Sequence, residues 1–385
     1  MFCNNCGNEL SENTEFCPKC GTKVGAVIKP KKKVDKKKIL LIAIPVAAVA
    51  VIALIMAVMI PFLFKKELKY VDNGDGTATV TGYSLGRLVK YDSITSVVIP
   101  DTVKIHGKKL KVTVIGERAF LYFEELTSIY FPSGLTTIGD YAFGSNGFSH
   151  EKLTHVNFPD TLISIGAKAF DRQRNLTNIT FPSSLVSIGD EAFCECEGLT
   201  DIKFPESLTS IGDGAFRGCE GLTSVKFANS YTSIGAHAFS RCGALAKLEL
   251  PNTLVSIGDG AFSSCDSLTG NLVLPASLTY LGHGAFSGCD GLTGVTLPNS
   301  LTVIEPYTFN ECSGLTSIEL PDSLTSIGDM AFYWCSGLTS IELPDSLTSI
   351  GDEAFRMCGY LDVYLSKTTS IGENAFNDSV TIHFK

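Results

Sequence analysis

The thirteen cysteines are the residues of this chain with the clearest potential for chemistry, and their spacing divides them into two sets. The first set forms two C-x-x-C-G motifs, built on Cys3 and Cys6 and on Cys17 and Cys20, with ten residues between the motifs. Each motif turns tightly and leaves its two thiolates on one side, so that together they offer the four sulfur ligands that tetrahedral Zn²⁺ favours. A segment of about 25 residues cannot build a hydrophobic core, so the metal would supply the folding energy. The sequence predicts one structural zinc ion.

Two motifs, each followed by glycine and with no βαβ pattern nearby, favour zinc over a redox disulfide or an iron–sulfur cluster. Residues 1–23 resemble the short zinc-ribbon domains found at the N-termini of many bacterial membrane proteins. A Cys₄ site is closed to substrate, which indicates a structural metal. The segment could also act as a small module that docks a cytoplasmic partner.

Eight of the other nine cysteines recur at intervals of 23 or 24 residues. They are Cys196, Cys219, Cys242, Cys265, Cys289, Cys312, Cys335 and Cys358. Equivalent positions of a repeat stack on one another, so we expect a column of buried thiols. Neighbouring rungs would be near disulfide distance, but parallel side chains suit a bridge poorly, which favours free thiols. Cys194 falls outside the column, and we expect it to be more accessible.

This column belongs to a block of about 23 residues that repeats along the last two thirds of the chain. One copy runs from Leu199 to Cys219, and its Ala-Phe pair, or Thr-Phe once, marks each copy. The repeated phenylalanines are at positions 120, 143, 170, 193, 216, 239, 262, 286, 309, 332, 355 and 376. A period of this length predicts a solenoid of stacked units, each too small to bury its own apolar face.

Within one copy, alternating apolar residues over 199–204 predict a short strand that ends at Pro205. A second apolar pair follows, and the chain then turns at Gly212, where the turn needs either positive φ or close packing. Asp213 fits the N-cap of a short helical turn that carries Ala215 and Phe216 inward. We therefore expect each rung to consist of a strand, a turn, a helical turn and a return.

The repeated phrase Ile-Gly-x-x-Ala-Phe-x-x-Cys-x-x-Leu resembles the leucine-rich repeats of the BspA-like bacterial surface family, over about residues 68 to 385. The resemblance implies a solenoid with a parallel sheet on its concave face. It also implies adhesion or ligand binding outside the cell.

Residues 39–64 form an uncharged apolar run of 26 residues, longer than the roughly 20 needed to cross a bilayer as a helix. Seven lysines lie between residues 29 and 38, against three between 65 and 69. The positive-inside rule therefore predicts a single-pass protein of the cell membrane with a cytoplasmic N-terminus and extracellular repeats. A nuclear-targeting or nucleic-acid role for the lysine run is the less favoured interpretation.

These features predict five segments: a zinc ribbon at 1–25, a basic juxtamembrane linker at 26–38 and a transmembrane helix at 39–64, then a capping hairpin with the first rung at 65–118 and leucine-rich repeats at 119–385. The predicted fold class is thus a leucine-rich repeat solenoid, rich in short parallel strands with short helical turns, joined to a small zinc ribbon and one membrane helix. The hairpin at 69–80 would cover the edge of the first rung.

Residues 65–385 contain 22 Lys and Arg against 36 Asp and Glu, a balance of −14, so we expect no nucleic-acid binding. The six histidines are scattered and no catalytic motif is present, which argues against an enzyme. If alternate strand residues point inward, the others form an exposed binding face. It comprises Tyr130, His155, Asn157, Thr180, Lys203, Lys226, Lys247, Glu249, Glu319 and Glu342, unless these are merely solvated strand residues.

Three functions fit this sequence. The first is a membrane-anchored surface protein whose repeats bind an extracellular protein or glycan. The second is a transmembrane regulator in which the zinc ribbon docks a cytoplasmic partner and the repeats sense a signal. The third is a purely structural role in the cell envelope.

Overall fold

The computed structural model describes residues 66–85, 94–145 and 152–385. The chain divides into two compact units, Met1–Ala57 and Val58–Lys385, and all described residues belong to the second. The four zinc-ribbon cysteines, the basic linker and the predicted membrane span lie outside the described residues. Within the described ranges, the structure contains no helix long and apolar enough to cross a bilayer.

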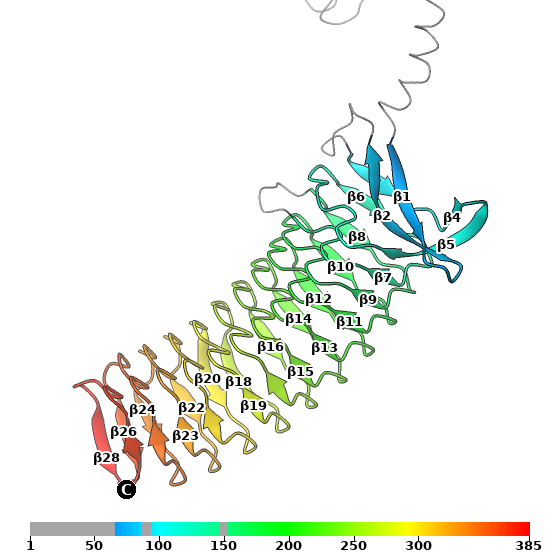
Figure 1. The fold of residues 1–385 in the computed structure, drawn as a ribbon. Helices are drawn as coiled ribbons and strands as arrows, with labels where there is room; N and C mark the ends of the chain where they lie inside the picture. Colours follow the sequence, from blue (N-terminus) through cyan, green and yellow to red (C-terminus); the bar gives the residue numbers. More distant parts are fainter. Residues whose placement is uncertain (1–65, 86–93, 146–151) are drawn as a thin grey trace, which may run out of the picture. The chain divides into compact units, whose positions relative to one another are not determined.

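The described unit is an elongated solenoid with two rows of short strands (Figure 1). The first row precedes the repeat proline. It comprises β3 (Ser96–Val98), β6 (Ser128–Tyr130), β8 (His155–Asn157), β10 (Asn178–Thr180), β12 (Asp201–Lys203), β14 (Ser224–Lys226), β16 (Lys247–Glu249), β18 (Gly270–Val273), β20 (Leu292–Thr296), β22 (Ser317–Glu319), β24 (Ser340–Glu342), β26 (Asp362–Leu365) and β28 (Thr381–Phe384).

The second row precedes the repeat glycine. It comprises β7 (Thr137–Ile138), β9 (Ser164–Ile165), β11 (Ser187–Ile188), β13 (Ser210–Ile211), β15 (Ser233–Ile234), β17 (Ser256–Ile257), β19 (Tyr280–Leu281), β21 (Val303–Ile304), β23 (Ser326–Ile327), β25 (Ser349–Ile350) and β27 (Ser370–Ile371). Strands within both rows pair in parallel, and equivalent residues of successive repeats lie side by side, as Ile188 does with Ile211. The stacked arrangement that the repeat predicted is confirmed.

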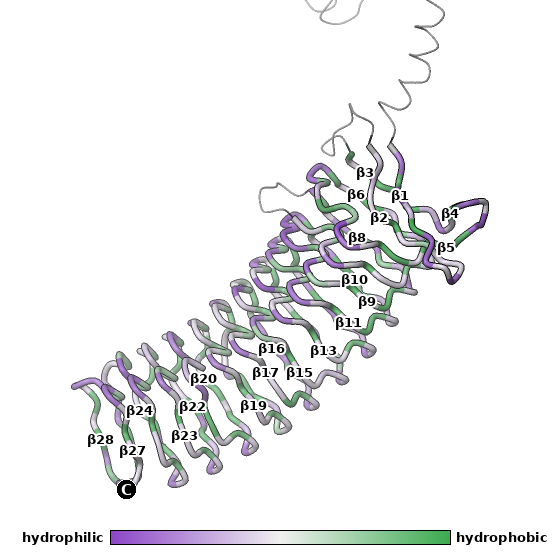
Figure 2. Tube along the Cα trace, viewed as in Figure 1, coloured by the Kyte–Doolittle hydropathy of each residue, from purple (hydrophilic) through white to green (hydrophobic). Residues whose placement is uncertain are grey.

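The core is a set of columns of identical side chains, and hydrophobic stretches recur at equivalent places in successive turns (Figure 2). The repeated phenylalanines stack nearly parallel from Phe120 to Phe376, with neighbouring ring centroids 5.0–6.1 Å apart. Each ring therefore covers its neighbour, and no single repeat could bury its own ring. Among the described residues, the buried hydrophobic core extends from position 78 to position 375 as one continuous cluster.

The eight column cysteines are fully buried free thiols. Each Sγ donates a hydrogen bond of 3.0–3.4 Å to a phenylalanine carbonyl oxygen of the preceding repeat. Burial raises the thiol pKa, to about 12 at Cys265 and Cys312. The column is thus a hydrogen-bonded part of the core.

The prediction of a short helical turn in each repeat is wrong, because the described residues contain no helix. The residue two before each repeat phenylalanine adopts positive φ, as Glu191 and Gly214 do, with φ of 52° and 60°. This left-handed residue ends the turn before a helix can continue. Asp213 does not cap its own repeat: its Oδ1 accepts the backbone N–H of Ala236 in the next repeat, at 2.8 Å.

The repeat glycine is required for close packing rather than for positive φ. Gly189 has no positive φ, but a Cβ placed there would lie 2.6 Å from the backbone nitrogen of Ala167 in the preceding turn. The same crowding recurs at Gly212 and Gly235. Glycine therefore allows successive turns to approach each other at this corner.

At the start of the solenoid, β1 (Lys66–Asp72) and β2 (Thr77–Leu85) form an antiparallel hairpin. β2 pairs in parallel with β5 (Lys108–Ile115), which continues into the second row through β7. β5 also pairs with β4 (Thr102–Ile105) in a second, unpredicted hairpin that projects beside the solenoid (Figure 1).

Candidate binding face

The exposed side of the first row is the strongest candidate for a binding site, and we call it the strand face. In each three-residue strand the central side chain turns inward and the outer two turn outward, as in Asp201, Ile202 and Lys203. Parallel register lines up the outer residues along the solenoid, so that Lys203 lies beside Lys226. All ten residues predicted for the binding face are exposed here.

Three open grooves lie along the strand face. One, of about 780 Å³, lies over β10, β12 and β14. The second, of about 650 Å³, lies over β12, β14 and β16, and Lys203, Lys226 and Lys247 all line it. We call this second depression the basic groove. The structure therefore brings together the three lysines that the repeat register predicted.

The lysines of the basic groove differ in how they are paired. Lys247 Nζ lies 2.5 Å from Glu249 Oε1, and this contact, followed by the nearby charge of Lys226, holds the pKa of Glu249 below its usual value. In the part of the chain that the structure describes, neither Lys203 nor Lys226 forms an ion pair. These two ammonium groups are available to an external anion without breaking an internal contact.

The third groove, of about 610 Å³, is acidic and lies over β22 and β24. Glu319 and Glu342 line it, and Lys385 Nζ reaches into it, 2.9 Å from Glu342 Oε1. Glu319 and Glu342 are therefore separated from the basic groove by the intervening repeats. The strand face carries a basic region and an acidic region rather than one uniform surface.

The remaining predicted residues occupy the N-terminal part of the strand face. Tyr130 on β6 is 60% exposed. His155 and Asn157 on β8 pair in register with Asn178 and Thr180 on β10. No strand pairing joins β6 to β8, so the tyrosine and the histidine belong to separate sheets.

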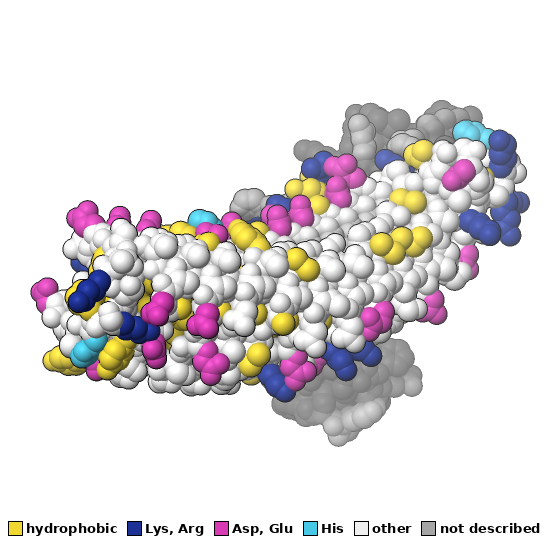
Figure 3. All heavy atoms as spheres, turned by 90° about the horizontal axis from the view of Figure 1, so that it is seen from below, with side chains coloured by type: hydrophobic (Ala, Val, Ile, Leu, Met, Phe, Trp, Pro, Cys, Tyr) yellow, Lys and Arg dark blue, Asp and Glu magenta, His cyan; other side chains and the backbone are white. Residues whose placement is uncertain are grey.

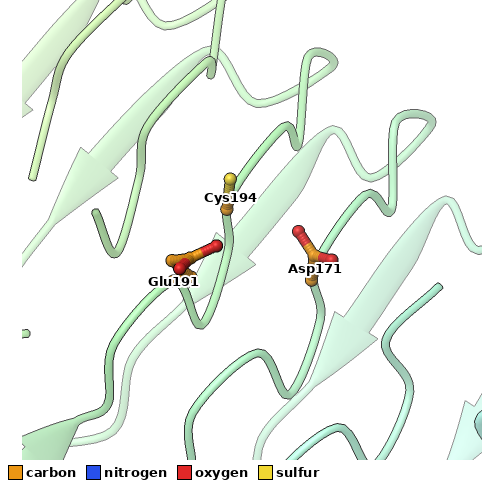
Figure 4. A group of neighbouring side chains, drawn as sticks. All are labelled: Asp171, Glu191 and Cys194. Carbon is orange, nitrogen blue, oxygen red and sulfur yellow. The ribbon is translucent and has the colours of Figure 1, made fainter. Parts of the chain in front are cut away.

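A second cluster lies away from the strand face, on the turns that carry the repeat phenylalanines. Asp171 comes from one turn, and Glu191 and Cys194 come from the next (Figure 4). Their ligand atoms lie within 4.8 Å of one another, which would suit a metal ion. Arg217 opposes that interpretation, because its Nη2 lies 3.5 Å from both Glu191 Oε2 and Cys194 Sγ.

Further cations reinforce this point. Lys168 Nζ lies 3.3 Å from Glu191 Oε2, and burial raises the pKa of the Cys194 thiol to about 11. The glutamate is thus already paired and the thiol stays protonated at neutral pH. The cluster is a charge network that joins neighbouring turns. The expected accessibility of Cys194 is wrong, since the side chain is only 1% exposed.

The repeats match a known family model. The model describes a BspA type leucine-rich repeat region and matches residues 88–146, 143–269 and 256–383, more than half of the chain. The chain belongs to the BspA-type leucine-rich repeat family. A zinc-ribbon model matches residues 2–24, which contain all four predicted zinc ligands. No curated protein matches the chain.

The chain is also similar to solved structures of leucine-rich repeat proteins. A leucine-rich repeat protein from Bacteroides ovatus is 29% identical, with a TM-score of 0.56 over 83% of this chain and 98% of that chain. A leucine rich cell surface protein from Faecalibacterium prausnitzii is 28% identical, with a TM-score of 0.47 over 81% and 94%. A third, from Eubacterium ventriosum, is 22% identical, with a TM-score of 0.45 over 77% and 93%.

Two exposed features lie outside the predicted strand-face residues. Trp334, which is 50% exposed, stands on a turn beside Tyr333, with ring centroids 6.4 Å apart. The β4–β5 hairpin was missed entirely, although the sequence contains its signal. His106 and Gly107 form a two-residue turn with φ of 48° and 80°, between two segments that alternate in polarity.

Proposed function

We propose that this protein is a single-pass, membrane-anchored surface protein whose BspA-type repeats bind a protein or glycan outside the cell. The proposal has no catalytic step. The observation that carries it is the basic groove, where two lysines without ion-pair partners among the described residues adjoin Lys247 on a regular, exposed sheet. A solenoid presents a long rigid surface of this kind for recognition.

The residues of the basic groove are suited to binding rather than to supporting the fold. Lys203 and Lys226 are exposed, whereas Ile202 and Val225 between them are buried. A residue whose side chain packs in the core tolerates few substitutions. An exposed strand residue contributes little to the core, so its side chain is free to contact a ligand. An anionic group on the ligand, such as a carboxylate or sulfate, would complement this groove.

The test compares two triple variants of the domain 66–385. Lys203→Ala, Lys226→Ala and Lys247→Ala remove the basic groove, and Arg241→Ala, Arg356→Ala and Lys367→Ala remove the same charge at exposed positions elsewhere. A glycan array and a panel of extracellular proteins are first screened for ligands that bind the wild-type domain saturably. The affinity of each such ligand is then measured for both triple variants. Three lost contacts of about 0.5–1 kcal/mol each should weaken binding about 10- to 100-fold in the first variant. Equal affinity of the first variant and the wild type would reject the groove.

The membrane topology is tested separately, by protease treatment of intact cells that express the full chain. We expect the repeats to be removed from outside while an epitope at the N-terminus stays protected, because the lysine-rich flank favours the cytoplasm. An N-terminal epitope that is cleaved from outside would contradict this topology.

A transmembrane regulator is the alternative, and the zinc-ribbon match at residues 2–24 favours it. The fit of a Cys₄ set to Zn²⁺ rests on sulfur chemistry alone, with Cys3, Cys6, Cys17 and Cys20 as ligands. Deletion of residues 1–25 distinguishes the two functions. Unchanged adhesion supports a surface binder, whereas lost adhesion with normal surface display supports the regulator.

A further inference from the structure

The β4–β5 hairpin concentrates positive charge in an otherwise acidic domain. It contains Lys104, Lys108, Lys109 and Lys111 and no acidic residue from position 102 to 115. All four side chains are exposed. Figure 3 shows several basic side chains gathered at the right-hand end of the molecule, where this hairpin projects, with an acidic side chain close to them; other acidic and basic side chains are scattered over the rest of this face.

Strand register gathers three of these lysines on one side of the hairpin. Lys104 lies directly opposite Lys109, and Thr102 lies opposite Lys111. On the other side of β5, Leu110 and Val112 are buried and Lys108 is exposed at the turn end. Like charges placed directly opposite each other destabilise a strand pair. The fold therefore tolerates a repulsion that an external anion would relieve.

The acidic side chains nearest in the chain hold turns and loops together. Asp72 Oδ1 accepts the N–H of Gly74 at 2.8 Å, and Asp75 Oδ1 accepts the N–H of Thr77 at 2.9 Å. Asp101 Oδ1 accepts hydrogen bonds from both the N–H and the hydroxyl of Ser133, at 2.6 and 2.9 Å. Within residues 66–85, 94–145 and 152–385, none of the four hairpin lysines forms an ion pair. The charge of the hairpin is not neutralised by the domain itself.

We propose that the β4–β5 hairpin binds a linear polymer that bears phosphate groups along its length. A row of ammonium groups on one exposed side suits a chain of repeated anions, because several phosphates can be contacted at once and their counterions released. The site is distinct from the basic groove of the strand face, so either can exist without the other.

The register favours a polymer over the headgroups of a bilayer. Lys111 lies beside Thr77, at the turn end of the β1–β2 hairpin, whereas the chain enters the domain at Lys66, at the opposite end of β1. Six strand residues separate the two levels, which is about 20 Å along the strand at 3.3 Å per residue. A soluble polymer can reach the hairpin directly, whereas any headgroup held at the level of Lys66 would be more than twice the Debye length away at physiological salt.

The experiment measures binding of inorganic polyphosphate to the domain 66–385 at several salt concentrations, and repeats the key points with the full chain in neutral detergent. Three contacts at about −0.7 each, from the lysines that share one side of the hairpin, predict a slope of log affinity against log salt near −2, or about 20-fold weaker binding at 200 mM than at 50 mM salt. Lys104→Gln, Lys108→Gln, Lys109→Gln and Lys111→Gln together should abolish most binding, and the four corresponding arginine substitutions should retain it.

A matched control carries Lys152→Gln, Arg241→Gln, Arg356→Gln and Lys367→Gln, four exposed residues outside both the hairpin and the basic groove; these changes alter the net charge equally and should leave polyphosphate affinity unchanged. Vesicles of equal phosphatidylglycerol and phosphatidylcholine should bind at least tenfold more weakly than polyphosphate. Three results would overturn the proposal: no polyphosphate binding, equal loss in both glutamine variants, or tighter binding to vesicles. If only ligand binding at the basic groove were lost, the proposal for the β4–β5 hairpin would be unaffected.

Discussion

Hydroxyl side chains occupy two kinds of position in this solenoid, and the difference separates structure from recognition. In the loop before the second row, Ser207 Oγ donates to the carbonyl oxygen of Leu185 at 2.5 Å, and equivalent bonds join most neighbouring repeats. On the strand face, Ser340 is exposed and varies with lysine, histidine or aspartate in other repeats. Constant positions tie one repeat to the next, and variable positions face outward.

The largest effect should come from a constant position in the core. Phe216→Ala removes a fully buried ring that lies between Phe193 and Phe239, at 5.3 and 5.5 Å. We expect a loss of about 3–5 kcal/mol in unfolding free energy, measured by urea denaturation. Lys203→Ala in the same repeat should change it by less than about 0.5 kcal/mol. Similar losses in both variants would erase the distinction between the two kinds of position.

The effect of replacing a glycine by alanine depends on how closely the neighbouring turn approaches that glycine. Gly189→Ala would place a Cβ 2.6 Å from the nitrogen of Ala167, whereas Gly243→Ala meets no atom within 4 Å, and neither residue has positive φ. We expect a loss of about 1–3 kcal/mol for the first change. The second should be neutral or slightly stabilising. A neutral Gly189→Ala would show that successive turns can separate at this corner.

Asp171 is a variable residue of the repeat, but unlike the strand-face residues it is buried, with only 9% of its surface exposed. It therefore tests whether a variable position can also affect stability. Burial raises its pKa from 3.8 to about 6, while Arg172 and Lys168 act in the opposite direction. The folded state therefore favours the protonated form, and its contribution is complete below about pH 4 and is lost as the pH rises through 6. Unfolding free energy should fall by about 1.4 kcal/mol between pH 5 and 7.5 from this group alone.

The variant Asp171→Asn isolates that contribution from other titrating groups. It should reduce the decline in stability between pH 5 and 7.5 by about the same amount. Identical pH profiles for wild type and Asp171→Asn would show that the carboxyl is solvated.

The period of the repeat was enough to predict the stacked fold, because a recurring spacing places equivalent residues in register whatever the details of each turn. The same spacing predicts that Lys203 lies beside Lys226, as it does in the structure. Inside the turn the prediction of an Asp213 helix cap is wrong. The Asp213 carboxylate instead accepts a hydrogen bond from the next repeat, and the sequence of one repeat taken alone does not reveal a contact between repeats.

The departures from the repeat were harder to predict. Cys194 lies outside the thiol column, and side chains of both neighbouring turns, Asp171 and Arg217, lie close to its thiol. The β4–β5 hairpin was missed because it interrupts the first repeat and shares none of its pattern, although His106 and Gly107 marked its turn. Local turn signals deserve more weight where a periodic pattern is absent.

The smallest effect concerns the hydroxyl column itself. Ser207→Ala removes one hydrogen bond between repeats and leaves the Leu185 carbonyl without that donor, so we expect about 1 kcal/mol lower unfolding free energy. Ser340→Ala removes an exposed hydroxyl for which no intramolecular hydrogen bond is found among the described residues, and it should be neutral. If each column bond contributes independently, Ser207→Ala and Ser346→Ala combined should add, since the two lie several repeats apart. A double variant that loses clearly more than the sum would mean that the column acts cooperatively along the solenoid.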